Sequence, residues 1–264
     1  MNDGVVRQAL ITPERVSNDC IRLDRWTLDG GAAASIDVAD SDLAWFQLLG
    51  GAAVLDGTAG RHELTASHVV FLPPGFSGDL STDDGAVVLY GGVPDARRFD
   101  PDFGASLEFR CVNWRLEPAL ASVHDARKRV YLVTPTLFGT RAVKGEMIFY
   151  PAGTRAPNHH HEGAEHFQFV TSGSGTALLG DVPHPVRAGD TIYNYQFERH
   201  SFVSDRDEEL VFVEYFVPAE CSTVWVDPDV VCTWEPTGRN IDGGEPSRHI
   251  GAHSSAETVN PEGV

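Results

Sequence analysis

Four histidines lie close together in the run NHHHEGAEHFQF, which covers residues 158–169. Imidazole nitrogens bind Fe, Mn, Ni, Cu and Zn, and a nearby carboxylate favours the harder divalent ions. Side chains at alternate positions of a strand point to the same face, so His159 and His161 are spaced to direct two imidazoles at one ion. The run therefore predicts a site for one divalent metal ion per chain, in the C-terminal half of the sequence.

Two motifs around this run resemble those of the cupin superfamily, whose members are small β-barrels that hold one divalent metal. The first, GTRAPNHHHEGAEHFQFVTSG, extends from Gly153 to Gly173 and contains the HxH pair, an acidic residue and a strand that ends in glycine. The second, AGDTIYNYQFERHSF, has a Gly-Asp turn, a strand, a tight bend and a histidine, His200. Because the two linked motifs stand at the right separation, the resemblance implies a metal-binding cupin barrel with His200 as a ligand.

The third ligand of this implied set depends on the register of the strand. Counting forward from His161 leads to Glu165, the usual carboxylate of the family, whereas counting back from Gly173 leads to His166. One extra residue therefore lies between the two halves of the motif, where we expect a β-bulge. Whether Glu165 or His166 completes the set stays open at this point. The candidate metal ligands in this frame are His159, His161, Glu165, His166 and His200.

A second frame uses His160 and Glu162 together with His166. That spacing resembles the bicupin ureidoglycine aminohydrolases, in which the order of His and Glu differs and a Gln takes the position of His200. We favour the first frame. In either frame some histidines are left over, and these are expected to orient the ligands or to serve as a general base.

Inward-facing positions on the same strands supply the candidate catalytic residues, Arg155, Glu165, Tyr193 and Tyr195. Arg155 is suited to hold a carboxylate or phosphate through two parallel hydrogen bonds. Tyr193 and Tyr195 alternate on one strand and share a face, so both are candidates to donate to a substrate oxygen. Together with Glu165 they are the expected general bases of a non-oxidative reaction.

The elements around these motifs are short alternating or apolar runs, such as Leu210 to Val217, separated by Gly, Asp and Pro. This pattern predicts an all-β fold. An internal repeat places Gly51 on Gly173 and continues without a gap to Gly78 and His200. The resemblance therefore implies two tandem cupin barrels, of the double-stranded β-helix or jelly-roll type.

The repeat divides the chain into four parts. We expect an N-terminal degenerate cupin at residues 1–95, a connecting segment at 96–141, a metal-binding cupin at 142–235 and a polar tail at 236–264. Gly78 stands in the first copy where His200 stands in the second, and nothing upstream of Gly78 supplies an HxH pair. The first barrel is therefore expected to be metal-free.

The 264-residue chain has the composition of a globular protein, with 42% hydrophobic residues. Its net charge of -18 argues against nucleic acid and anionic membranes as partners. It has no apolar stretch approaching the roughly 20 residues that span a bilayer, and no basic start followed by an apolar run that would indicate a signal peptide. We therefore expect a cytoplasmic protein whose four cysteines are free thiols.

The resemblance implies a metal-dependent enzyme that acts on a small polar metabolite. We expect a cupin oxidoreductase first, a dioxygenase in which Fe(II) chelates the substrate and keeps positions open for O₂, with Mn, Ni and Zn as the other candidate metals. The alternatives are a non-oxidative hydrolase, isomerase or lyase, and a non-catalytic module that binds a small molecule. Cupins of this kind are commonly dimers, so a homodimer is expected.

Overall fold

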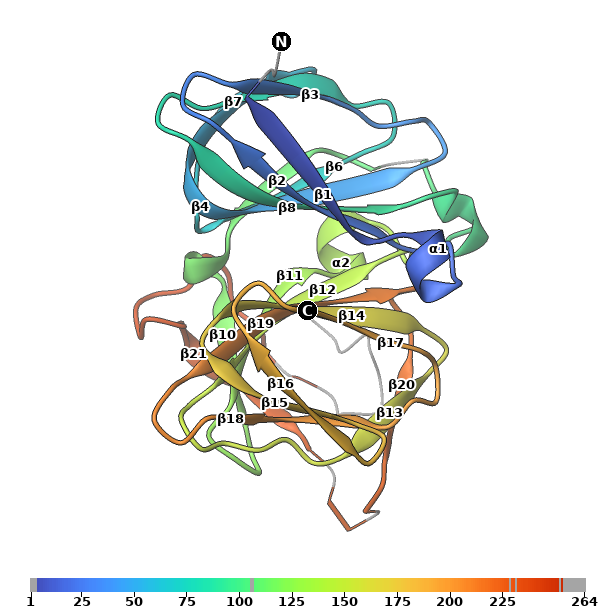
Figure 1. Ribbon diagram of the computed structural model, residues 1–264, viewed down its shortest axis with the longest axis vertical. Coiled ribbons are helices and arrows are strands. Elements are labelled where there is room, and N and C mark those ends of the chain that lie inside the picture. The colour runs from blue at the N-terminus through green and yellow to red at the C-terminus, as the bar shows by residue number, and fades with distance from the viewer. Residues whose placement is uncertain (1–3, 105–106, 228, 231, 252, 254–264) are drawn as a thin grey trace. The chain divides into compact units, whose positions relative to one another are not determined.

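The chain forms two compact units made almost entirely of strands, residues 1–114 and 115–264 (Figure 1). The computed structural model describes residues 4–104, 107–227, 229–230, 232–251 and 253. The all-β prediction is confirmed, because each unit is built from antiparallel sheets and the described helices have three or four residues each. No helix in the described part of the chain is long and apolar enough to cross a membrane.

The first unit is a sheet of nine strands that bends over on itself around an apolar core. Strands β1, β2, β8, β4, β6 and β9 lie side by side, while β3, β5 and β7 continue the sheet from the second half of β4. The elements are β1 (Val5–Ile11), α1 (Pro13–Val16), β2 (Arg22–Leu28), β3 (Ala33–Asp37), β4 (Leu43–Gly57), β5 (Gly60–Thr65), β6 (His68–Leu72), β7 (Ser77–Ser81), β8 (Ala86–Val93), η1 (Ala96–Arg98) and β9 (Arg110–Asn113).

The second unit consists of two facing sheets that enclose its core. A seven-stranded sheet runs in the order β17-β14-β19-β12-β11-β10-β21, and a five-stranded sheet in the order β16-β15-β18-β13-β20. The elements are η2 (Trp114–Leu116), β10 (Pro118–Ser122), β11 (Lys128–Val133), α2 (Pro135–Phe138), β12 (Lys144–Tyr150), β13 (His159–Glu162), β14 (Glu165–Ser172), β15 (Ser174–Leu179), β16 (Val182–Arg187), β17 (Thr191–Asn194), β18 (His200–Ser204), β19 (Leu210–Val217), β20 (Ser222–Trp225) and β21 (Trp234–Asn240).

The internal repeat of the sequence is visible in the positions of the strands. The offset that places Gly51 on Gly173 also carries β2 onto β12, β5 onto β16, and β4 onto β14 and β15 together. Both glycines have a positive φ, +77° for Gly51 and +78° for Gly173. A Cβ at either one would overlap the backbone carbonyl oxygen of the residue just before the neighbouring strand, Gly85 or Glu209. Only glycine satisfies both requirements at this bend, so the repeat is a structural one.

The interior of the first barrel is filled by apolar side chains, among them Phe46, Leu48 and Val70. Gly78, the counterpart of His200, pairs with Gly57 across β7 and β4. A Cβ at Gly78 would lie 2.8 Å from the oxygen of Asp56 and 2.8 Å from the Cα of Gly57, which is too close for any side chain. The position that carries a candidate ligand in the second barrel therefore has no room for one in the first.

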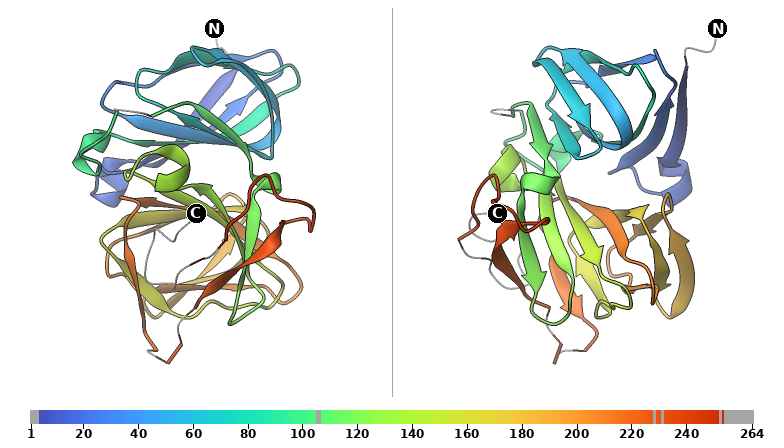
Figure 2. Two further views of the ribbon diagram at one scale, coloured as in Figure 1. Left: turned by 180° about the vertical axis from the view of Figure 1, so that it is seen from behind. Right: turned by 90° about the vertical axis from the view of Figure 1, so that its left-hand side faces the viewer.

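The expected domain boundaries differ from those of the structure. The segment 96–141, expected to connect the barrels, contributes β9 to the first unit and β10, β11 and α2 to the second. The expected tail at 236–264 begins inside β21, which pairs with β10 at the edge of the seven-stranded sheet (Figure 2). Both segments look polar for local reasons. The strand β21 is an edge strand, where Pro and Gly are tolerated, and β11 begins with the charged residues Lys128 and Arg129.

Candidate metal centre

Three histidines and one glutamate converge inside the second barrel. His161 comes from β13, His166 from β14, His200 from β18 and Glu214 from β19, so both sheets contribute. All four side chains are buried, and one potential ligand atom of each lies within 4.8 Å of the others. The Nε2 of His166 is 3.2 Å from the Nε2 of His200 and 3.6 Å from a carboxylate oxygen of Glu214.

These distances suit a single divalent ion. Protein nitrogens bind such ions at about 2.0–2.1 Å, so two ligand atoms on one ion lie at most about 4.2 Å apart. The separations of 3.2 and 3.6 Å fall within this limit, and the bound of 4.8 Å on every separation in the group exceeds it by about 0.6 Å. Three imidazoles with one carboxylate are a donor set suited to Fe or Mn. The four residues therefore fit a metal ion.

Hydrogen bonds on the outer ring nitrogens fix how two of these histidines, His161 and His200, face the centre. The Nδ1 of His200 lies 2.9 Å from the carbonyl oxygen of Glu198, and the Nδ1 of His161 lies 3.1 Å from the Oγ1 of Thr223. A carbonyl oxygen only accepts, so the proton of His200 sits on Nδ1 and its Nε2 presents a lone pair to the centre. This is the arrangement by which proteins orient a metal-binding imidazole.

Glu214 is held in place by a chain of buried amides. The Nε2 of Gln168 donates to Glu214 at 2.5 Å, and the Nδ2 of Asn194 donates to the Oε1 of Gln168 at 2.6 Å. Burial, followed by the nearby carboxylate of Glu146, raises the pKa of Glu214 to about 8. Such a carboxyl group is costly to bury as an isolated anion, which is consistent with a partner of positive charge at this position.

His159 lies beside the four-residue group rather than in it. Its ring centre is 4.5 Å from that of His200 and 4.9 Å from that of Trp225 on β20. Its Nδ1 donates to the carbonyl oxygen of Pro157 at 2.9 Å, so its Nε2 also carries a lone pair. His159 is thus a neutral imidazole on the wall of the same cavity.

The structure places His166, and not Glu165, in the four-residue group. The pairing of β14 with β19 continues without a shift from Glu165 to Val170, so alternate residues keep their faces along this stretch. His166 shares its face with Gln168 and points to the centre, whereas Glu165 points to the opposite face, where it is half-buried. The expected irregularity is present in the motif, because the pairing of β14 with β19 shifts register between Val170 and Ser172, on the C-terminal side of His166.

Two of the expected catalytic residues lie with Glu165 on this opposite face. A hydrogen bond with Tyr193 lowers the pKa of Glu165 but is outweighed by burial, which raises it. The rings of Tyr193 and Tyr195 are in edge contact at 5.2 Å, and Tyr195 is 43% exposed. None of the three lines the cavity, so the structure does not bring the expected ligand and general bases to the four-residue group. The reason is that side chains alternate between the two faces of a strand, so a one-residue shift of register moves every side chain to the other face.

The remaining expectations also fall outside the pocket. The second frame fails because the Nε2 of His160 pairs with a carboxylate oxygen of Glu162 at 3.2 Å on the outward face of β13, away from His161. Arg155 is exposed and forms an isolated bridge with Val203. It therefore holds no substrate in the cavity.

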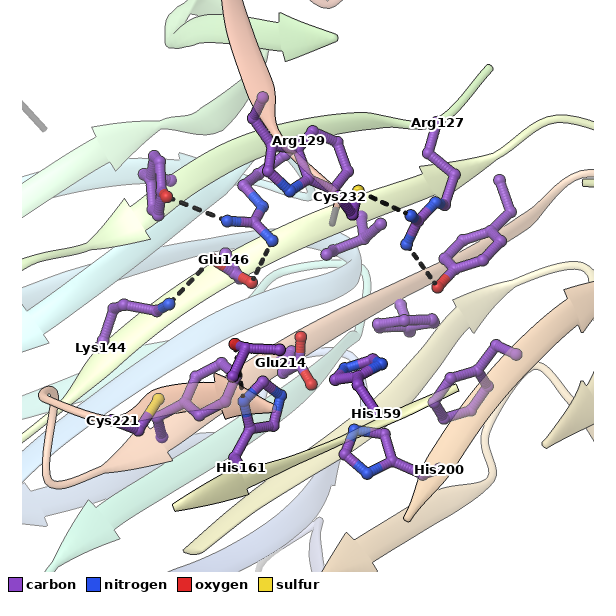
Figure 3. Close-up of a pocket in the computed structure, with 18 of the residues that line it drawn as sticks. Arg127, Arg129, Lys144, Glu146, His159, His161, His200, Glu214, Cys221 and Cys232 are labelled. Carbon is purple, nitrogen blue, oxygen red and sulfur yellow. Dashed lines mark hydrogen bonds and ion pairs between the residues drawn. The ribbon is translucent and has the colours of Figure 1, made fainter. Parts of the chain in front are cut away.

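The cavity beside the metal centre has a volume of about 60 Å³, and positively charged side chains form part of its wall (Figure 3). Arg129 pairs with a carboxylate oxygen of Glu146 at 3.3 Å, and Lys144 pairs with its other oxygen, also at 3.3 Å. Arg127 binds both carboxylate oxygens of Asp125 and donates to the Sγ of Cys232 at 3.1 Å. All of these cations were missed from the sequence.

The pocket histidines give the metal-free protein a defined pH dependence. Burial lowers the pKa of His200 to about 4 and holds the pKa values of His159, His161 and His166 well below 6.5. The folded state thus favours neutral rings, and its stability is fully present above about pH 6.5 and lost as the pH falls toward 4. Glu214, whose pKa is raised, acts in the opposite direction between about pH 4.5 and 8, but it is one group against four histidines whose pKa values are all lowered.

We expect the free energy of unfolding of the chelator-treated protein to fall between pH 6.5 and 4, by about 3 kcal/mol for His200 alone. Urea titrations at several pH values measure this. The His200→Gln variant removes one titrating ring and should show the shallower fall. Parallel profiles for the two proteins would contradict the assignment of a neutral, buried His200.

Comparisons with known proteins agree with this architecture. Residues 145–216 match the family model described as a cupin domain. An 88-residue segment is 36% identical to Protein SchB of Streptomyces halstedii. The matched segment makes up 33% of this chain and 63% of SchB. The matched segment thus spans less than two thirds of that relative.

Solved structures extend the likeness over both units. Protein Ylba from E. coli superposes with a TM-score of 0.65 at 13% identity, over 81% of this chain and 83% of that one. A putative glyoxylate-induced protein from Pseudomonas aeruginosa gives 0.68 at 15% identity, over 81% and 80%. An oxalate decarboxylase from Bacillus subtilis gives 0.65 at 13% identity, over 84% and 74%. At these identities the likeness is one of fold: the chain has the cupin fold, with a cupin domain at residues 145–216.

Proposed function

We propose that this cupin-fold protein is a metal-dependent enzyme for a small polar metabolite, with one divalent ion held by His161, His166, His200 and Glu214. The observation that carries the proposal is the convergence of these four buried side chains, three of which, His161, His200 and Glu214, line an internal cavity. The ion would bind the substrate through oxygen atoms and polarise it. A purely structural cluster would not need a cavity lined by further polar and charged groups.

An oxygenase with Fe(II) is the first reaction we propose. Four protein ligands leave two positions of a six-coordinate ion for substrate and O₂, and the donor set of three imidazoles and one carboxylate suits iron. Within the cavity, Phe202, Phe212 and Phe216 supply an apolar wall beside the ligands. Such a wall keeps water away from a reactive centre.

A non-oxidative reaction is the second candidate, and one specific observation favours it. His159 lines the cavity as a neutral imidazole whose free Nε2 is a base. It can accept a proton from a substrate held beside it without being needed as a ligand. The fold relative from Bacillus subtilis is named an oxalate decarboxylase, so a lyase reaction is among those that this fold accommodates.

Metal analysis and oxygen consumption test these proposals together. The purified chain is reconstituted with Fe(II), Mn(II), Ni(II) or Zn(II), and its metal content is measured by mass spectrometry; we expect one ion per chain. The loaded protein is then supplied with diketones, catechols and keto acids in an oxygen electrode. Oxygen uptake that requires iron supports the oxygenase. Turnover without uptake, reduced by His159→Gln, supports the second candidate, and a chain that retains no metal contradicts both.

A further inference from the structure

The wall of the cavity that faces the histidines carries three cations. Arg127 and Arg129 come from or just before β11, and Lys144 from β12, all in the seven-stranded sheet. His159, His161 and His200 come from β13 and β18 of the five-stranded sheet. Figure 3 shows the arginines on one side of the cavity, the three histidines on the other, and Glu214 between them.

The cations of this wall have few direct acidic partners. Lys144 and Arg129 share the single carboxylate of Glu146, while Arg127 is neutralised by Asp125. The remaining carboxylate of the cavity, Glu214, is assigned to the divalent ion by the proposed function. With the ion bound, the cavity therefore carries an excess of positive charge, which attracts an anion.

Two buried N–H groups of residues that line this cavity also have no acceptor among the described residues. They are the Nε of Arg129 and the Nε1 of Trp225. Buried donors are nearly always satisfied in folded proteins, so a pair of orphans on one cavity points to an acceptor that comes from outside the chain. The guanidinium of Arg129 is fixed for this purpose, because it lies 4.3 Å from the centre of the Trp234 ring and donates to the hydroxyl of Tyr131 at 3.0 Å.

We propose that the substrate is a small organic anion whose carboxylate binds to Arg129, opposite the metal centre. The proposal rests on the proposed function and adds the class of substrate to it. Arg129 offers a planar donor fork, which suits a carboxylate. The cavity is small, with a volume of about 60 Å³, so the group that enters it is a compact one. Glu146 holds Arg129 in this position from below the anion.

Binding of acetate, with neutral acetamide as its matched counterpart, tests the carboxylate site. Trp225 and Trp234 line the cavity, so tryptophan fluorescence reports the titration. We expect acetate but not acetamide to bind the full chain, and Arg129→Met to weaken acetate binding by at least about tenfold. Arg187→Met, which alters an exposed arginine of the same unit, should bind acetate as the unchanged protein does.

Two further measurements keep the outcome decisive. Arg129→Met leaves Glu146 with one cation fewer, so the double variant Arg129→Met/Glu146→Gln removes both partners, and its thermal midpoint shows that it is folded. The titration is run on metal-free and metal-loaded protein, with metal content measured in each. Loss of acetate binding with unchanged metal content supports the carboxylate site. Equal binding by Arg129→Met, or equal binding of acetamide, overturns it. A chain that binds acetate through Arg129 but no metal refutes the proposed function alone.

Discussion

Replacement of His166 by alanine is expected to remove the divalent ion, whereas replacement of its neighbour Glu165 is expected to leave the ion bound. His166 contributes its Nε2 to the four-residue group and lies within 3.6 Å of two other ligand atoms. Glu165 points to the opposite face of β14. Loss of a residue that only hydrogen-bonds to a metal ligand already weakens metal binding about 10–100-fold. Loss of the ligand itself should therefore lower the metal affinity further.

Metal content after dialysis, and competition with a coloured chelator, measure this difference. The ring of His166 is stacked on Phe216 at 4.9 Å, so alanine also leaves a small cavity. His166→Gln fills most of that space and should lose the ion as well, while circular dichroism confirms that the barrel is intact. An ion retained by both His166 variants and lost from Glu165→Ala would show that the register of β14 is the other one.

Replacement of Gly173 by alanine is expected to cause the largest loss of stability among single methyl additions in the second barrel. The residue has a φ of +78°, and its Cβ would overlap the carbonyl oxygen of Glu209 at the entry to β19. The left-handed conformation costs about 1–2 kcal/mol for alanine, and the steric conflict with fixed backbone adds a similar amount. We expect the free energy of unfolding to fall by about 3 kcal/mol or more.

Gly153 provides the matched control for this experiment. Its φ of +73° is nearly the same, but a Cβ there meets no atom within 4 Å. Gly153→Ala should therefore lose only the conformational part, about 1–2 kcal/mol. Urea titrations of both variants in the presence of a chelator give the two values. Equal losses in the free energy of unfolding would mean that the backbone at Glu209 moves aside easily, so that the short contact with the added Cβ costs nothing.

The architecture of the second barrel could be predicted from the sequence because its two motifs are local. Each motif places ligands within a few residues of turn glycines, so His161 and His200 follow from spacing alone, and the structure brings them together. The choice between Glu165 and His166 could not be made in this way. The choice depends on which face of β14 each residue occupies, and the pairing of β14 with β19 determines this.

Glu214 was missed because its ligand partners are distant in the sequence. A signal was nevertheless present: the run LVFVEYFV in β19 is apolar except for one glutamate, and a carboxylate is rarely buried without a partner. The same signal lies in β12, where Lys144 and Glu146 alternate in a strand that is buried along its whole length. Isolated charges in otherwise apolar strands were therefore the better indicators of the pocket.

The arginines of the pocket were missed for the opposite reason. The stretch HDARKR contains so many charges that it resembles a solvated connection, and it was interpreted as one. Side chains alternate between the two faces of the strand. Arg129 and Tyr131 share a face and line the cavity, whereas Lys128 points the other way and is exposed. A charged run at a strand start should thus be examined residue by residue.

The close pairing of Gly57 and Gly78 limits what a single substitution can add to the first barrel. In the second barrel the corresponding partner of His200 is Leu179, so that pair of strands accommodates side chains on both sides. Replacement of Gly78 by histidine alone would not give the first barrel a ligand, because β4 and β7 would first have to separate. A redesign that adds a metal site to this barrel therefore has to widen the spacing of the two strands before it introduces an imidazole.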